Sequence, residues 1–262
     1  MKRILAFILV AVLMLSLFAC GGDKPTDTIK IEKSGVLMIA HRGLSGLEKE
    51  NTDSAFVAAG ERSYYGIEAD VRRTADGKFV ICHDEKLKMG FLKKRIDVEG
   101  STLEELLAID LPTENEGEYE HLTDLDSYIE ICKRYDKQVI LELKSEFTNE
   151  EITSIISILK AHNYLERVTF ISFYYEQLQF IREQLPDQPL QFLTEWFSNR
   201  ILRMLVEDKI DIAISHKRLT NRVMRKLKEA GIKVNCWTVD DARIAQKLID
   251  MGVDYITTNI LE

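Results

Sequence analysis

The chain has 262 residues, of which 45% are hydrophobic and 30% are charged, a composition that supports one globular domain with a sizeable core. The formal net charge of -8 at pH 7 argues against a general nucleic-acid-binding protein, which would be basic, so we expect no nucleic-acid partner. An acidic chain can still bind a small anion where its positive charges are local.

The first twenty residues have the pattern of an export signal. Two basic residues precede an almost wholly apolar run over residues 4–19, which is shorter than the ~20 residues that a membrane-spanning helix needs. The end of the run, LFAC, resembles a bacterial lipobox, which predicts a signal peptide over residues 1–19 and a lipid on Cys20. An uncleaved anchor and an ordinary signal peptide are the alternatives. All three place the remaining chain outside the cytoplasm, and the lipid would hold it at the cell membrane.

Residues 20–35 are polar and predict a tether between that anchor and the folded domain, which we expect over residues 36–262. Three further cysteines, at positions 82, 132 and 236, are odd in number and widely spaced. This pattern favours small buried side chains over a disulfide framework.

From residue 36 onward, short apolar runs alternate with longer amphipathic ones, which is typical of a parallel sheet covered by helices. The predicted strands are Val36–His41, Gly66–Val71, Gln138–Lys144, Arg167–Phe173, Pro189–Thr194, Ile210–His216, Ile232–Thr238 and Val253–Thr258. The predicted helices are Thr52–Gly60, Asp124–Tyr135, Asn149–His162, Tyr174–Leu185, Ser198–Val206, Asn221–Ala230 and Asp240–Met251.

Eight such strands in this length predict an α/β fold in which the sheet closes into a (β/α)₈ barrel. An open doubly wound sheet is the alternative, weakened because no glycine-rich phosphate loop follows the first strand. Residues 78–82 predict an extended arm after the second strand, and residues 85–123 an insertion with a short helix over Thr102–Ala108. Such an insertion can shape a substrate site or be a solvated surface loop.

Three carboxylates lie near the ends of neighbouring predicted strands. Glu68 and Asp70 are two residues apart, so they point to one face of the second strand, and Glu142 lies near the end of the next predicted barrel strand. Facing inward, the carboxylates would repel one another unless a cation lay between them. Oxygen-only ligation favours Mg²⁺ or Ca²⁺ over zinc.

Other chemically active side chains fall at the ends of further predicted strands or of the extended arm. His41 and His83 suit a base and an acid that move protons, and Arg42 and Lys144 suit contacts with a phosphate. Trp237 is predicted to wall the pocket or pack under a cationic head group, with core packing as the alternative. Together these residues predict metal-assisted cleavage of a phosphate ester.

At these positions the sequence resembles the glycerophosphodiester phosphodiesterase family. The resemblance runs in order from about residue 36 to residue 258 and includes His41-Arg42-Gly43, Glu50-Asn51-Thr52, Glu68-x-Asp70-Val71, Thr74-x-Asp76-Gly77, His83-Asp84, Glu142-x-Lys144, Ser172-Phe173 and Trp237-Thr238-Val239. It implies a TIM barrel that hydrolyses glycerophosphodiesters to glycerol 3-phosphate and an alcohol. The resemblance gives His41 and His83 the acid–base roles, Glu68, Asp70 and Glu142 the metal, and Arg42 and Lys144 the phosphate.

Three departures from the family pattern concern substrate contacts and loop shape. Lys49 stands where proline is usual, residues 86–90 lack the usual arginine-threonine pair, and Thr258-Asn259 replaces the usual Thr-Asp. We therefore keep two alternatives, a phospholipase D-like cleavage of lysophospholipids and a non-catalytic lipoprotein that binds glycerophosphodiesters.

Overall fold

The structure is a computed structural model that describes residues 26–89, 94–113 and 117–262. The predicted signal peptide over residues 1–19 and the predicted lipid site at Cys20 lie outside the described residues. Among the described residues, none of the helices is long and apolar enough to cross a membrane.

Eight parallel strands close into a barrel, as predicted. In order around the ring they are β1 (Leu37–Ala40), β14 (Tyr255–Thr258), β13 (Val234–Trp237), β12 (Asp211–Ser215), β11 (Leu190–Thr194), β10 (Val168–Ser172), β9 (Gln138–Leu143) and β2 (Gly66–Arg73). Pairing of β1 with β2, at Ile39↔Gly66 and Ala40↔Ile67, closes the ring. The open-sheet alternative is therefore wrong, because both edges of the sheet are paired with each other.

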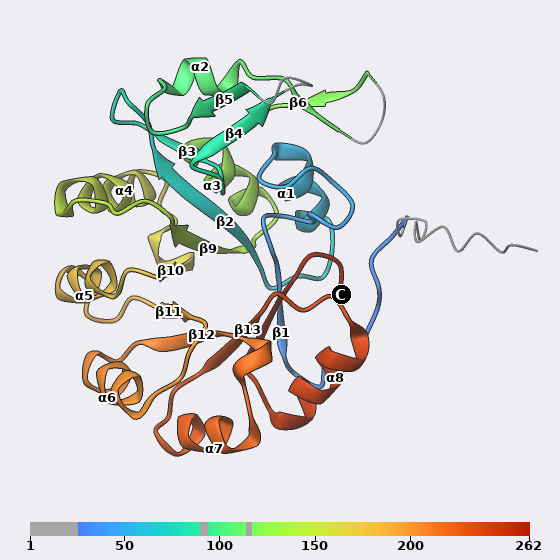
Figure 1. The fold of residues 1–262 in the computed structure, drawn as a ribbon, viewed down its shortest axis with the longest axis vertical. Helices are drawn as coiled ribbons and strands as arrows, with labels where there is room; N and C mark the ends of the chain where they lie inside the picture. The colour runs from blue at the N-terminus through green and yellow to red at the C-terminus, as the bar shows by residue number, and fades with distance from the viewer. Residues whose placement is uncertain (1–25, 90–93, 114–116) are drawn as a thin grey trace, which may run out of the picture.

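Helices surround the ring (Figure 1). They are α1 (Asp53–Gly60), α3 (Leu125–Arg134), α4 (Asn149–Ala161), α5 (Tyr175–Gln184), α6 (Asn199–Asp208), α7 (Asn221–Glu229) and α8 (Ala242–Met251), with 3-10 turns at Leu165–Arg167 and His216–Arg218. Their ends follow local sequence signals. In α4, for example, Thr148 and Glu151 form a reciprocal capping box that satisfies backbone N–H groups at the helix start.

The alternation of side chains along the strands decides what faces the barrel interior. On β9, Val139, Leu141 and Leu143 pack in the large core between strands and helices, whereas Ile140 packs in a smaller cluster inside the barrel. Because successive strand residues point to opposite faces, Glu142 points inward with Ile140. The same alternation on β2 turns Glu68 and Asp70 inward, since Ile67, Ala69 and Val71 belong to the outer core.

The insertion after β2 is a small folded unit rather than a solvated loop (top of Figure 1). It contains β3 (Phe79–Ile81), which pairs antiparallel with β2, the hairpin β4 (Lys86–Met89) and β5 (Lys94–Asp97), α2 (Leu103–Leu107), the pair β6 (Leu111–Pro112) and β7 (Tyr119–Glu120), and β8 (Thr123–Asp124). A separate apolar cluster holds it together, made of Val80, Cys82, Leu87, Val98, Leu106, Leu111 and Leu122. The predicted helix over Thr102–Ala108 corresponds to α2 and its caps.

The last part of the predicted tether is attached to the barrel. The Ile31 N–H donates to the Glu262 carbonyl at 2.8 Å, and the Thr28 hydroxyl donates to the Glu262 side chain at 2.7 Å. Ile29 forms a parallel bridge with Leu261. The three cysteines of the described chain are free and buried, as predicted.

Candidate active site

A cavity of about 220 Å³ opens at the carboxyl ends of the barrel strands, where active sites of this fold lie. Its lining includes seven of the site residues predicted from the sequence: His41, Arg42, Glu68, His83, Glu142, Lys144 and Trp237. Asp70 is buried immediately behind them and belongs to the same carboxylate cluster. The predicted site residues, drawn from separate strands and loops, therefore converge on one place.

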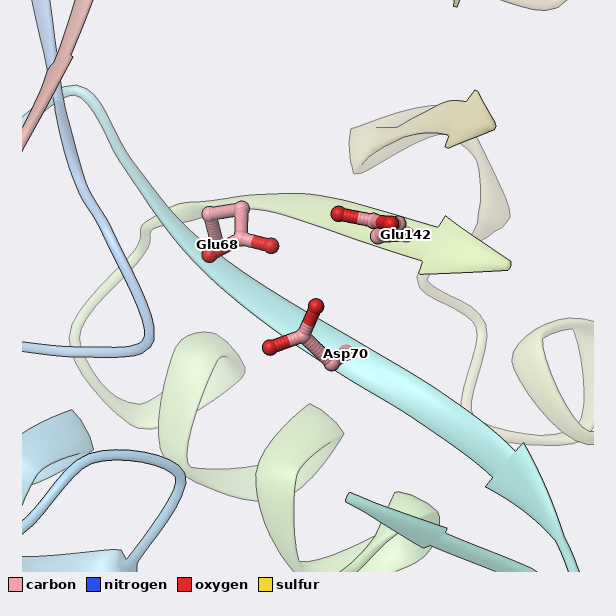
Figure 2. A group of neighbouring side chains, drawn as sticks. All are labelled: Glu68, Asp70 and Glu142. Carbon is pink, nitrogen blue, oxygen red and sulfur yellow. The ribbon is translucent and has the colours of Figure 1, made fainter. Parts of the chain in front are cut away.

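The three carboxylates form a compact cluster. Oxygens of Glu68, Asp70 and Glu142 lie within 4.8 Å of one another, and the three residues are 2%, 1% and 7% exposed. Figure 2 shows Glu68 and Asp70 rising from β2 beside Glu142 on the neighbouring β9, consistent with the register that pairs Asp70 with Glu142. Burial, and then the other carboxylates, raise the pKa of Glu68 well above its ordinary value and that of Glu142 to about 7.

Two cations partly neutralise this cluster. Nε of Arg42 lies 3.1 Å from Oδ2 of Asp70, and Nζ of Lys144 lies 2.8 Å from Oε1 of Glu142. Burial alone would raise the pKa of Asp70, but Arg42 and Lys144 lower it below its ordinary value. The carboxylates therefore outnumber the cations that touch them by three to two.

The donor set fits a hard cation. Oδ1 of Asp70 is buried and accepts no aligned hydrogen bond from the described chain, because Nζ of Lys144 stays 3.6 Å away. An orphaned buried carboxylate oxygen beside two further carboxylates leaves lone pairs for oxygen-seeking Mg²⁺ or Ca²⁺. Glu68, Asp70 and Glu142 are the residues that would hold it.

Backbone conformation at the end of β1 brings Arg42 into the site. Arg42 has a φ of 56° and Gly43 a φ of 76°, so the chain turns sharply after His41. The turn directs the Arg42 N–H to Oε2 of Glu68 at 2.8 Å, while its guanidinium reaches both oxygens of Glu50. A side chain on Gly43 would collide with Ala55 at 2.6 Å, so the close approach of α1 requires glycine there.

The two histidines lie in different surroundings. His41 is half-buried, and its Nδ1 lies 2.7 Å from Oδ1 of Asn259. Burial, reinforced by Arg42, lowers the pKa of His41. The His83 side chain is 33% exposed, and its Nδ1 lies 3.0 Å from the carboxylate of Asp84.

The insertion helps to place His83. Nε and a terminal nitrogen of Arg72 donate to the His83 carbonyl at 3.1 and 2.8 Å, and Arg72 also contacts Glu99 at 3.2 Å. Glu99 follows β5 and also binds Arg73 and the Ser145 hydroxyl, so it joins the insertion to β2 and to the end of β9.

Two aromatic side chains, Trp237 and Phe173, form part of the cavity wall. Trp237 meets Phe173 edge to face, with ring centroids 5.8 Å apart. Phe173 is 44% exposed, and Trp196, in the loop after β11, is 60% exposed. Trp237 therefore lines the cavity and does not belong only to the core.

Sequence reasoning missed several residues that contact the site. Asn51 has a φ of 58° and donates to Oδ2 of Asp70 at 3.0 Å; it stands in the family-like Glu-Asn-Thr motif, which was the available signal. Asn259 was noted only as a departure from the family pattern, with a change in substrate contact expected. The structure instead places it against His41. Glu99 carried no sequence signal.

The remaining histidines lie elsewhere. His162 is held between Asp126 and Glu130 at 2.7 Å from each, and His121 lies at the surface of the insertion. His216 begins the 3-10 turn after β12 and is absent from the lining of the main cavity.

The geometry agrees with comparisons to known proteins. A model of the glycerophosphoryl diester phosphodiesterase family matches residues 41–262. The chain belongs to this family. Members of the family are phosphoric diester hydrolases, and this enzyme therefore acts as a glycerophosphodiester phosphodiesterase.

Individual relatives support the assignment along most of the chain. A glycerophosphodiester phosphodiesterase of Caldanaerobacter subterraneus subsp. tengcongensis is 30% identical over 240 residues, covering 85% of this chain and 93% of that protein. A Bacillus subtilis glycerophosphodiester phosphodiesterase is 25% identical, covering 98% of this chain and 95% of its own. The solved structure of an Oleispira antarctica phosphodiesterase, in complex with the product sn-glycerol-3-phosphate, superposes with a TM-score of 0.78 at 28% identity, covering 85% of this chain and 92% of that one.

Proposed function

We propose that this enzyme hydrolyses glycerophosphodiesters to glycerol 3-phosphate and an alcohol, with a divalent cation, Ca²⁺ or Mg²⁺, bound by Glu68, Asp70 and Glu142. The observation that carries the proposal is the cluster of three buried carboxylates within 4.8 Å in a cavity that two histidines also line. A cation bound there supplies positive charge to the phosphoryl oxygens as negative charge develops on them.

The side chains of this chain would bind and orient the phosphate. Arg42 and Lys144 line the cavity with positive charge on the same side as the carboxylates. Their contacts with Asp70 and Glu142 hold both cations in place before substrate arrives, which limits the reorganisation that binding requires.

His41 and His83 would carry the protons. The substrate's own glycerol hydroxyl loses its proton to one histidine as its oxygen bonds to phosphorus. The bond from phosphorus to the alcohol oxygen then breaks, and the other histidine protonates that oxygen. Water opens the resulting cyclic phosphate with the proton transfers reversed, which yields glycerol 3-phosphate and restores both histidines. The sn-glycerol-3-phosphate in the Oleispira antarctica structure supports this product.

The aromatic wall of Trp237 and Phe173 would contact the less polar part of the substrate. Exposure of Phe173 and Trp196 at this end of the barrel favours one alternative, cleavage of lysophospholipids, since an acyl chain would cover such rings. Parallel assays of glycerophosphocholine and lysophosphatidylcholine separate the two. Cleavage of the lipid alone would reject the preferred substrate.

The test of the function uses the chain from Gly21 onward. Release of glycerol 3-phosphate from glycerophosphocholine and glycerophosphoethanolamine is followed with chelator, with Ca²⁺ and with Mg²⁺, for the wild type and for Glu68→Gln. The matched control is Glu61→Gln, an exposed carboxylate at the end of α1. We expect metal-dependent release that the Glu68 variant loses and the Glu61 variant keeps. Substrate binding without turnover under either cation would instead support the binding lipoprotein.

We also propose that a lipid on Cys20 holds the enzyme at the extracytoplasmic face of the cell membrane. The proposal is supported by the basic start, the apolar run and the LFAC ending of the first twenty residues. Fractionation of cells that express the wild type and Cys20→Ser tests it, and equal membrane retention of the two would refute the lipid.

A further inference from the structure

His41 is fixed from three directions at the junction of the first and last barrel strands. Its backbone N–H donates to the carbonyl of Thr258 at 2.8 Å, and its carbonyl accepts from the Ser45 hydroxyl at 2.7 Å. The ring Nδ1 meets Oδ1 of Asn259 at 2.7 Å. With Nδ1 so engaged, Nε2 is the ring nitrogen that remains for the substrate in the cavity.

Asp240 determines which way the Asn259 amide points. The backbone N–H and the side-chain Nδ2 of Asn259 both donate to the Asp240 carboxylate at 2.7 Å, and the Thr258 hydroxyl donates to it at 3.0 Å. If the amide were turned over, its oxygen would face a carboxylate oxygen at hydrogen-bond distance with no proton between them. The amide NH₂ therefore faces Asp240, and the amide oxygen faces His41.

An amide oxygen can only accept a hydrogen bond, so Nδ1 of His41 must carry the proton. A neutral imidazole with its proton on Nδ1 has a lone pair on Nε2. We propose that Asn259 and Asp240 are positioning residues that hold His41 in this tautomer and so make it the base that accepts the proton of the attacking hydroxyl. The proposal rests on the proposed phosphodiesterase reaction and divides the two histidine roles within it.

The surroundings of the two rings agree with this division. Among the charges that act on the His41 ring, Arg42 opposes a second ring proton, whereas Asp70 and Glu50 favour one. The amide of Asn259 separates His41 from the full negative charge of Asp240. At His83 the carboxylate of Asp84 contacts Nδ1 directly at 3.0 Å, with no amide between them, and the proposed division leaves this histidine to donate to the leaving alcohol.

The first experiment observes the ring nitrogens directly. Nitrogen-15 NMR of the enzyme labelled at its five histidines, assigned with His→Gln variants, is recorded at neutral pH. We expect His41 to show a protonated Nδ1 and an unprotonated Nε2 in the wild type, and a mixture of tautomers in Asn259→Leu. A wild-type His41 with the proton on Nε2 would overturn the proposal.

The second experiment measures kinetics on glycerophosphocholine. Asn259→Leu should lower kcat about 100-fold, within the ~10²–10⁴ that positioned acid–base groups contribute, with KM changed less than about threefold. Asn259→Asp places a carboxylate against Nδ1, so the acidic limb of the kcat/KM profile should move to higher pH. The control is Asn221→Asp, the same change at an exposed asparagine that begins α7; the limbs of its kcat/KM profile should stay at the wild-type pH values.

The outcomes separate this proposal from the reaction it rests on. An Asn259→Leu protein that is folded by circular dichroism but keeps wild-type kcat would overturn the positioning role, as would an unmoved acidic limb in Asn259→Asp. The ring-nitrogen spectra need no turnover. A wild type with the expected spectra and no hydrolysis would refute the proposed reaction and the role of base, while the placement of the proton would stand.

Discussion

Replacing Glu68 with glutamine should make the metal-free protein more stable while it abolishes metal-dependent activity. The carboxylate is 2% exposed, and burial followed by the charges of Asp70 and Glu142 raises its pKa. An acid whose pKa is raised by folding is destabilising in its charged form. Glutamine removes the charge but keeps an oxygen that can accept from the Arg42 N–H, a contact of 2.8 Å in the wild type.

The size of the effect follows from the geometry. Two unit charges at the 4.8 Å limit of the cluster repel by about 3 kcal/mol at an effective dielectric constant of ~20. The raised pKa means that Glu68 is only partly charged near neutral pH, so the gain is expected to be about 1–3 kcal/mol. For a domain of this size that corresponds to a rise in Tm of roughly 2–10 °C.

Scanning calorimetry in chelator, and again with Ca²⁺ or Mg²⁺, tests this reasoning. Cation should raise the Tm of the wild type, because a ligand that binds only the folded state stabilises it, and should raise that of Glu68→Gln much less. Glu61→Gln should behave as wild type in both conditions. A metal-free Glu68→Gln protein that melts below the wild type would refute the idea that the carboxylates repel in the folded chain.

Four further predictions concern other parts of the molecule. The pKa of Glu142 rises from 4.5 to about 7 on folding, so between these pH values the folded protein holds more protons than the unfolded chain. The free energy of unfolding of the metal-free protein should therefore fall by up to about 3 kcal/mol as the pH rises through this range, as measured by urea denaturation. Trp237→Ala should raise KM about tenfold and change kcat less than threefold in steady-state assays, because we propose that the ring contacts the less polar part of the substrate rather than the reacting atoms. Glu99→Gln should lower kcat about tenfold with little change in KM, because the insertion then holds the His83 backbone less firmly. Gly43→Ala should destabilise by about 2 kcal/mol more than Gly77→Ala in the same denaturation assay, since both have positive φ but only the first would clash.

The barrel could be predicted because its strands are continuous apolar runs and its helices are amphipathic with clear end signals. Residues 138–143, QVILEL, are buried throughout, and Gly252 ends α8 in the left-handed conformation. The insertion could not be predicted in the same way. Its strands are two to four residues long, and its core is made of side chains spread from Val80 to Leu122. No short stretch of its sequence therefore shows the regular spacing of apolar residues that predicts a helix or a strand.

The site was predictable where its residues share one strand. Glu68 and Asp70 must face the same way because they are two residues apart, and strand register then sets Glu142 beside Asp70. Contacts across the closed ring were not predictable. Asn259 reaches His41 over a separation of 218 residues, and Glu99 reaches Arg73 over 26, so neither contact is visible as a spacing.

The strand that closes the barrel has a consequence for how activity and folding are related. His41 follows the first strand and Asn259 follows the last, and the strap of residues 260–262 then binds the segment that enters β1. Contacts of such long sequence separation carry a high loop-closure entropy and form only when the intervening chain is already ordered. The orientation of His41 is thus among the last features that a folding chain acquires. Catalytic activity should therefore return later than the helical circular dichroism signal during refolding. Removal of the last four residues should abolish activity while the barrel remains folded.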